Sequence, residues 1–138
     1  MGRINVKGVI VGGLMAGLVL NVIDYLVYGV WLAQDLAAMQ RPGAPSMDSL
    51  IPLFVLLDFL YGIALVQLYA AIRPRFGAGP ATAVKAGIFV WVIAGLLHAI
   101  GEAPMGLMPQ RLYTIGAIVG LVAFTLAAVA GARFYKEA

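Results

Sequence analysis

Four long apolar stretches restrict the fold of this chain more than any other feature of its sequence. A helix needs about 20 mostly apolar residues to cross the roughly 30 Å hydrocarbon core of a bilayer. The stretches cover residues 6–33, 48–72, 81–101 and 112–135. Proline- and glycine-rich segments at 41–45 and 73–80 break the pattern between them, as turns do. The sequence therefore predicts an all-α fold, a polytopic transmembrane four-helix bundle, with residues 1–138 forming a single transmembrane domain.

The low content of charged residues supports the same conclusion. Asp, Glu, Lys and Arg make up 11% of the chain, whereas a soluble domain contains about 25%. This excludes an ordinary soluble enzyme and a disordered chain. The net charge of +3 includes no run of five or more like charges, so we expect no nucleic-acid partner. The absence of cysteine excludes disulfides, thiolate metal sites and a catalytic thiol. The predicted partner is the lipid bilayer.

Basic residues gather on one side of the predicted membrane. The amino terminus, the second loop and the carboxyl terminus hold most of them, namely Arg3, Lys7, Arg73, Arg75, Lys85, Arg133 and Lys136. The opposite side has only Arg41 and Arg111. Because cytoplasmic segments are enriched in lysine and arginine, we predict that both termini are cytoplasmic. Tyr28 and Trp31 then lie at the outer interface, where aromatic belts occur.

Ionisable side chains inside the spans are the first candidates for function, because inserting one costs at least about 2.5–3.5 kcal/mol. The candidates for ligand or proton binding are Asp58, His98, Glu102 and Asp24, with Tyr61 and Asn21 as polar neighbours. A helix rises about 1.5 Å per residue. On that scale Asp24 and Glu102 lie near the outer edge of the core and Asp58 lies near its midplane. Tyr61, one turn from Asp58, is its expected hydrogen-bond partner.

These residue types support several chemistries. His98 and Glu102 are four residues apart and share a helix face. Carboxylates with an imidazole can bind a divalent metal, relay protons or hold an organic cation among aromatic rings. The pair supplies only two ligands, fewer than a typical zinc or haem site uses, so the metal and any cofactor stay open. Structural roles are the alternative: Asp24 and Glu102 reaching headgroups, and His98 packing as a neutral side chain.

Small residues recur at the spacing that lets transmembrane helices approach closely. The predicted helix-packing positions are Gly8, Gly12, Gly13, Gly17, Gly95, Gly116 and Gly120. At 100° per residue, Gly13, Gly17, Asn21, Asp24, Tyr28 and Trp31 form one stripe. Packing along such stripes serves either the bundle itself or an oligomer, so a homo-oligomer or a membrane partner subunit is expected.

A shift of 78 residues brings the first span onto the third, with six identities over nineteen positions. The shift places Lys7 on Lys85, Gly17 on Gly95, and Asp24 on Glu102. One interpretation is therefore a bundle built from two duplicated helix pairs, related by an axis along the membrane normal. In that arrangement Asp24 and Glu102 would approach each other.

Two segments resemble an uncharacterised family of small bacterial four-helix integral membrane proteins. They are the run LYAAIRPRFGAGP at 68–80, followed by Ala86, Gly87 and Trp91, and the run GGLMAG at 12–17. The resemblance covers most of the chain and implies a bacterial inner-membrane protein, but it assigns no catalytic residues. Small multidrug transporters share the size and the helix count, yet their acid lies in the first half of the first span, whereas Asp24 lies late.

Three hypotheses about function follow. The first is a transporter or binding protein for a proton-coupled cation or small cationic molecule, with Asp58 at its centre. The second is a non-catalytic accessory subunit or assembly factor, whose intramembrane acids pair with another chain. The third, a membrane enzyme, is the least favoured, since the sequence shows neither a nucleophile nor a complete metal-ligand set.

Overall fold

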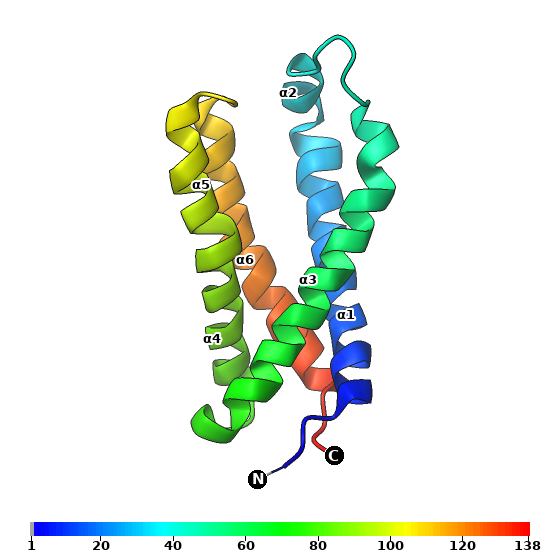
Figure 1. Ribbon diagram of the computed structural model, residues 1–138, viewed down its shortest axis with the longest axis vertical. Helices are drawn as coiled ribbons and strands as arrows, with labels where there is room; N and C mark the ends of the chain where they lie inside the picture. The colour runs from blue at the N-terminus through cyan, green and yellow to red at the C-terminus, as the bar shows by residue number, and fades with distance from the viewer. Residues whose placement is uncertain (1) are drawn as a thin grey trace.

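The computed structural model of the protein describes residues 2–138, and Figure 1 shows their all-helical arrangement. The first span contains α1 (Val6–Asp24), the π-helical segment η1 (Tyr25–Trp31) and the short α2 (Ala33–Ala38). The second is α3 (Met47–Phe76). The third contains α4 (Pro80–Trp91), the π-helical segment η2 (Val92–Leu96), α5 (Leu97–Glu102) and the 3-10 turn η3 (Ala103–Met105). The fourth is α6 (Gln110–Phe134).

These elements confirm the predicted fold class. Four continuous helical stretches are long and apolar enough to cross a membrane: Val6–Trp31, Met47–Phe76, Pro80–Met105 and Gln110–Phe134. The protein is therefore a multi-pass membrane protein. The third stretch extends past the predicted end at 101, because the 3-10 turn accommodates Pro104 and the chain leaves the helix only at Gly106, which has a left-handed φ of 66°.

Capping residues explain where the helices begin and end. The Asn5 side chain accepts a hydrogen bond from the Gly8 amide at 3.1 Å and starts α1. Ser46 does the same for α3, accepting from the Ser49 amide at 3.2 Å. Gly77 follows the last residue of α3 with φ of 84°, a conformation that favours glycine. Pro80 then occupies the first turn of α4, where its missing N–H costs nothing.

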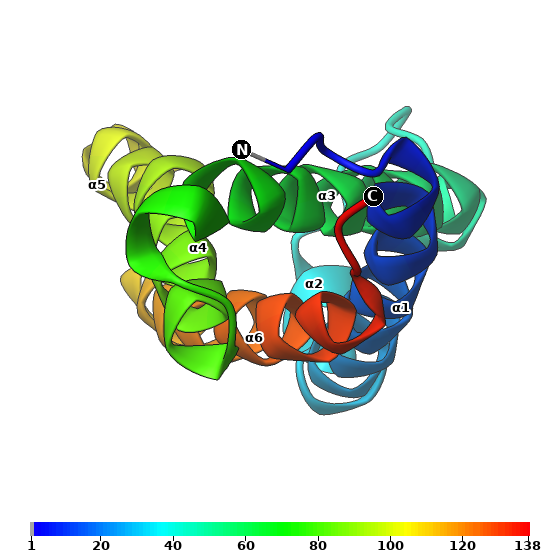
Figure 2. The same cartoon turned by 90° about the horizontal axis from the view of Figure 1, so that it is seen from below.

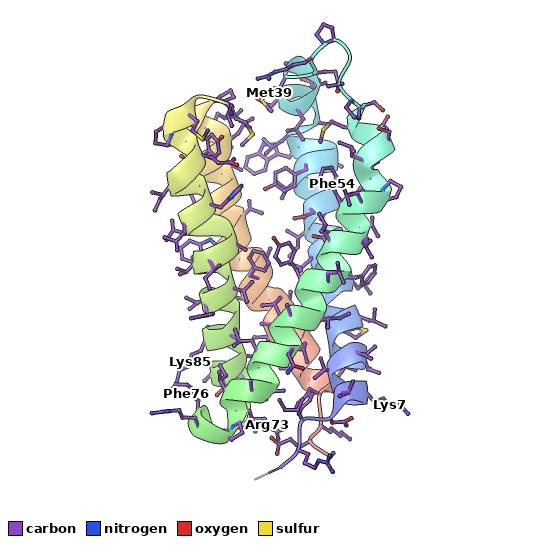
Figure 3. The ribbon with its side chains drawn as sticks, viewed as in Figure 1. Lys7, Met39, Phe54, Arg73, Phe76 and Lys85 are labelled. Carbon is purple, nitrogen blue, oxygen red and sulfur yellow. The ribbon has the colours of Figure 1, made fainter. Side chains whose placement is uncertain are left out.

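The helices form a square when seen along the membrane normal (Figure 2). The helices follow one another around this square in the order α1, α3, α4, α6, and α3 also contacts α6 across it. Consecutive spans pair as α1 with α3 and α4 with α6, and α1 also packs against α6. Figure 1 shows that the two pairs meet near both termini and diverge toward the end that carries α2 and α5. In Figure 3, Lys7, Arg73 and Lys85 lie at the end of the termini, and Met39 lies at the opposite end.

Glycines bring α1 into close contact with two helices. A Cβ added at Gly13 would lie 2.6 Å from the Ile63 Cα, and one at Gly12 would lie 2.6 Å from the Gly131 carbonyl oxygen. Gly62 sits against the backbones of Gly13 and Gly17. No larger residue fits such an approach without moving a helix, which is how small residues promote packing in lipid.

The other predicted packing glycines have different neighbours. Gly8 lies against the carboxyl-terminal segment, with the Lys136 carbonyl 3.2 Å from its added Cβ. Gly95 and Gly120 face the ring of Trp91, and Gly116 faces the hydroxyl of Tyr28. These three positions accommodate aromatic side chains rather than a neighbouring helix backbone.

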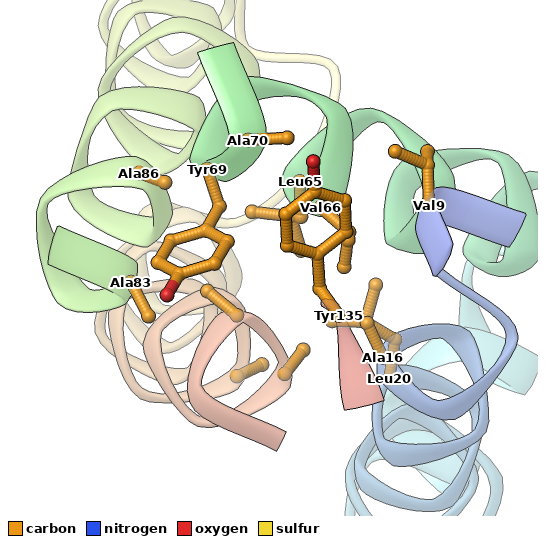
Figure 4. Close-up of a cluster of buried hydrophobic side chains, with 13 residues drawn as sticks. Val9, Ala16, Leu20, Leu65, Val66, Tyr69, Ala70, Ala83, Ala86 and Tyr135 are labelled. Carbon is orange, nitrogen blue, oxygen red and sulfur yellow. The ribbon is translucent and has the colours of Figure 1, made fainter. Parts of the chain in front are cut away.

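The core is concentrated near the termini, where the two pairs meet. Figure 4 shows Leu65, Val66, Tyr69 and Tyr135 among small alanines. The rings of Tyr69 and Tyr135 contact each other edge to face, with centroids 6.0 Å apart. The Tyr135 hydroxyl accepts a hydrogen bond from the Asn5 amide at 3.2 Å. This network closes the bundle at the end of the termini and leaves the other end open.

The predicted internal repeat remains a prediction. The pairing of consecutive spans agrees with two helix pairs. However, the π-helical segments fall at 25–31 and 92–96, so the shift of 78 residues does not superpose them. Asp24 lies against Asp58, and Glu102 lies against His98. Each acid thus has its partner within its own helix pair.

Candidate functional site

A cavity of about 210 Å³ lies between the two helix pairs, in the half of the bundle away from the termini. Its polar lining residues are Tyr28, His98, Glu102 and Tyr113. Apolar or small residues complete it: Leu32, Leu36, Ala94, Gly95, Ala99, Met108, Leu112, Gly116 and Ala117. We call this space the polar cavity. It brings together two of the predicted site residues, His98 and Glu102, with Tyr28, one of the aromatic rings expected around a cation, and Tyr113, which was not predicted.

Both π-helical segments border the polar cavity. Tyr28 belongs to η1, and Ala94 and Gly95 belong to η2. Each π-helical turn rotates the residues that follow relative to an α-helix, and such turns are frequent at functional sites. Within η1, Tyr28 lines the cavity near Asp24, as the predicted stripe places it, whereas Trp31 is exposed on the outer surface. The stripe predicted for the first span therefore ends at Tyr28.

The His98 and Glu102 side chains contact each other on the α5 face of the cavity. His98 Nε2 lies 3.2 Å from Glu102 Oε1, as expected for side chains one helical turn apart. The His98 side chain is mostly exposed, whereas that of Glu102 is about two-thirds covered. The carboxylate thus lies deeper than the imidazole and supplies a negative charge to the cavity.

Tyr113 brings a buried hydroxyl to the same cavity. The residue is only 6% exposed. Its Oη makes no hydrogen bond of ideal geometry among residues 2–138, but the Glu102 carboxylate lies close enough to accept one. The Tyr113 hydroxyl and the Glu102 carboxylate therefore form one polar cluster on the wall of the cavity.

Asp24 and Asp58 form a second polar cluster, deeper in the bundle. Their carboxyl groups lie within hydrogen-bonding reach of each other, and Asp58 is 8% exposed. Two carboxyl groups can share such a bond only when one of them is protonated, since an ionised carboxylate only accepts. A proton shared between Asp24 and Asp58 would satisfy both groups.

Helix direction explains how these two acids meet, although counting along the spans placed them at different depths. The α1 and α3 helices are antiparallel neighbours. Helical side chains lean toward the amino terminus of their own helix. Asp24 consequently leans toward the midplane, and Asp58 leans toward the opposite end, where Asp24 lies. The expected partner of Asp58, Tyr61, instead packs its ring edge to face against Phe124, with centroids 5.6 Å apart.

Tyr28 lies between the two clusters. It lines the polar cavity, and both Asp24 and Asp58 are close enough to act on its hydroxyl electrostatically. Its Oη also lies 3.4 Å from a Cβ added at Gly116, so the side chain reaches from η1 to α6. Tyr28 thus connects the carboxyl pair with the cavity.

Asn21 has a packing position rather than a place in either cluster. Its Nδ2 donates to the Gly17 carbonyl at 2.9 Å within α1 and to the Val55 carbonyl of α3 at 3.5 Å. The amide therefore links the two helices one turn below Asp24.

An ion pair joins the two helix pairs at the mouth of the polar cavity. Arg111 Nη1 donates to Asp35 Oδ1 at 2.9 Å. Asp35 belongs to α2 and Arg111 to α6, and the next residues along the chain, Leu36 and Leu112, line the cavity. Both charged side chains are substantially exposed.

No three His, Cys, Asp or Glu side chains lie close enough to hold one metal ion in the part of the chain that the structure describes. Asp24 instead pairs with Asp58, and Glu102 pairs with His98. No family model matches the chain, and no curated protein or solved structure matches it.

Proposed function

We propose that this multi-pass membrane protein binds a small organic cation in the polar cavity, as a transporter or binding protein. The observation that carries the proposal is the Glu102 carboxylate, lying with the Tyr28 and Tyr113 side chains in the wall of one cavity. A carboxylate inside a span is costly unless it is paired or serves a binding site. A cation bound there would compensate that charge.

The lining of the cavity favours an organic cation. Tyr28 and Tyr113 provide aromatic rings, which attract cations through their faces, and Glu102 provides the opposite charge. A volume of about 210 Å³ corresponds to the liquid volume of about seven water molecules. These features fit an ammonium or quaternary ammonium group.

The Asp24–Asp58 pair would couple binding to protons. A cation entering beside Tyr28 raises the local positive charge, which favours release of the proton that the pair shares. Exchange of a proton for a cation at neighbouring sites is the elementary step of proton-coupled transport. Asp58 is thus the proton site of the proposal, and Glu102 is the cation site.

The pairing of Asp24 with Asp58 favours binding over the accessory-subunit alternative. In that alternative, the intramembrane acids would pair with side chains of another protein chain. Asp24 and Asp58 instead face each other within this chain. We retain the bacterial inner membrane, with both termini in the cytoplasm, as part of the proposal, supported by the charge distribution and the resemblance of the sequence. The homo-oligomer is retained on the small-residue stripes alone.

The test is binding of tetramethylammonium to the protein in nanodiscs of phosphatidylglycerol, which contains no amine. We expect saturable binding that Glu102→Gln weakens by about tenfold or more, because the substitution removes the charge that faces the cation. The matched control is Glu137→Gln, since Glu137 is an exposed acid outside the spans. Binding that is absent in the wild type, or weakened equally by both substitutions, would contradict the proposal.

A further inference from the structure

An apolar groove lies beside the polar cavity on the outer surface of the bundle. Its volume is about 450 Å³, and it runs between the third and fourth spans. The residues that line only the groove are Trp91, Leu96, Ile100, Ala103, Gln110, Thr114, Ile118 and Leu121. Ile100 and Ile118 are 60% and 62% exposed. Because this surface faces lipid in a membrane-spanning chain, acyl chains surround the groove.

The apolar groove and the polar cavity share a thin wall. Ala99, Tyr113 and Ala117 line both spaces. Two of these residues have only a methyl side chain, and the third, Tyr113, carries the buried hydroxyl that lies beside Glu102. The cavity is thus separated from the membrane by one layer of side chains, with a polar group at the point where the two spaces adjoin.

From this juxtaposition we infer that the substrate is a single-chain amphiphile with a cationic head, which enters laterally from the membrane. The head occupies the polar cavity beside Glu102, and the tail lies in the apolar groove. The groove runs between two neighbouring helices and therefore seats one chain. This inference rests on the proposed function and names the substrate class of the same site.

Charge and polarity assign the two ends of the substrate. The acids nearest the cavity are Glu102 and the Asp24–Asp58 pair, whereas the cationic Arg111 at its mouth is bound to Asp35. An anionic head would meet the negative charge of Glu102, which contacts the His98 imidazole on the same wall, whereas a cationic head meets its complement. The residues that line only the groove are mainly apolar. Contact between them and a hydrocarbon tail is therefore favourable.

The experiment compares tetramethylammonium, the head alone, with dodecyltrimethylammonium in the same phosphatidylglycerol nanodiscs. Binding is measured after subtraction of partitioning into protein-free discs and of binding to the Glu102→Gln variant. We expect the dodecyl compound to bind at least about tenfold more tightly, because its tail covers apolar surface in the groove.

A pair of variants on the lipid-facing surface locates the tail. Ile118→Trp fills the groove and should remove most of the gain of the dodecyl compound, while the affinity for tetramethylammonium stays unchanged. Val122→Trp is the matched control, because Val122 is 51% exposed on the same helix and does not line the groove. Equal effects of both variants would show general membrane partitioning and overturn the inference.

The remaining outcomes separate this inference from the proposed function. Equal affinity for both compounds would overturn the inference that the substrate is an amphiphile, and it would leave the proposed cation site in place. Absence of binding by either compound would overturn the cation site itself. Loss of dodecyltrimethylammonium binding when phosphatidylethanolamine is added to the discs would identify a bilayer phospholipid as the occupant, and would overturn the assignment to a single-chain substrate.

Discussion

The contact between α1 and α3 can be tested with one methyl group, by the substitution Gly62→Ala. The added Cβ would lie 2.8 Å from the Gly17 Cα, where ordinary contact begins at 3.4 Å. It would also meet the Gly13 carbonyl oxygen. These are backbone atoms of a helix, so no side-chain rotation can relieve the clash, and one helix must move away from the other by about 0.6 Å.

The free-energy change combines two opposite effects. Inserting a methyl group into a well-packed interface costs about 1–3 kcal/mol. Alanine favours the helix over glycine by about 1 kcal/mol. Because the clash is with backbone atoms, the cost lies in the upper part of the first range, at about 2–3 kcal/mol. We therefore expect a net loss of about 1–2 kcal/mol in the free energy of unfolding, which lowers the ratio of folded to unfolded protein roughly 5- to 30-fold.

The assay is unfolding by sodium dodecyl sulfate in mixed micelles, followed by circular dichroism. The matched control is Gly101→Ala, because a Cβ at Gly101 meets nothing within 4 Å and the residue is helical. This control should retain or slightly raise stability. If Gly62→Ala unfolds at the same detergent fraction as Gly101→Ala, the close approach of α1 and α3 is wrong.

Three further predictions concern other parts of the molecule. Trp91→Phe removes the hydrogen bond from its Nε1 to a carbonyl of α6 at 2.8 Å and should cost about 0.5–1.5 kcal/mol in the same unfolding assay; an unchanged midpoint would refute that bond. A double-mutant cycle on Asp35 and Arg111 should give a coupling energy below about 1 kcal/mol that falls as salt increases, whereas a salt-independent coupling would argue against an exposed ion pair. In this cysteine-free chain, an impermeant maleimide should label Ala44→Cys in intact cells but Ala138→Cys only after permeabilisation, and the reverse pattern would invert the proposed orientation.

The sequence was sufficient to predict the helices because the bilayer imposes one requirement on every span. Each must be about 20 apolar residues long. Proline and glycine mark the breaks only approximately, because α3 continues through Pro74 to Phe76, past the predicted end at 72. The cap at Ser46 and the turn after Phe76 follow from local chemistry. Packing was less predictable: Gly62 has no small residue four positions away, so the spacing rule that identifies Gly13 and Gly17 passes over it.

The polar clusters depended on features that one-dimensional patterns do not contain. Helix counting assigned Asp24 and Asp58 to different depths, because it ignores the opposite lean of side chains on antiparallel helices. The π-helical segments at 25–31 and 92–96, which border the cavity, have no recognisable sequence signature. Tyr113 was overlooked because it lies near a span end, where tyrosine is expected at the interface. Its position one turn before Gly116, on the face that meets Tyr28, was the available signal.

The divergence of the two helix pairs makes the protein wider in one leaflet than in the other. In the leaflet where the protein is wider, lateral pressure from the lipids acts to push the two helix pairs together and to reduce the volume of the polar cavity. A ligand that holds the pairs apart opposes this pressure. Because such coupling is reciprocal, lipids that increase the pressure in that leaflet lower the affinity for the ligand, and ligand binding in turn expands the area that the protein occupies there.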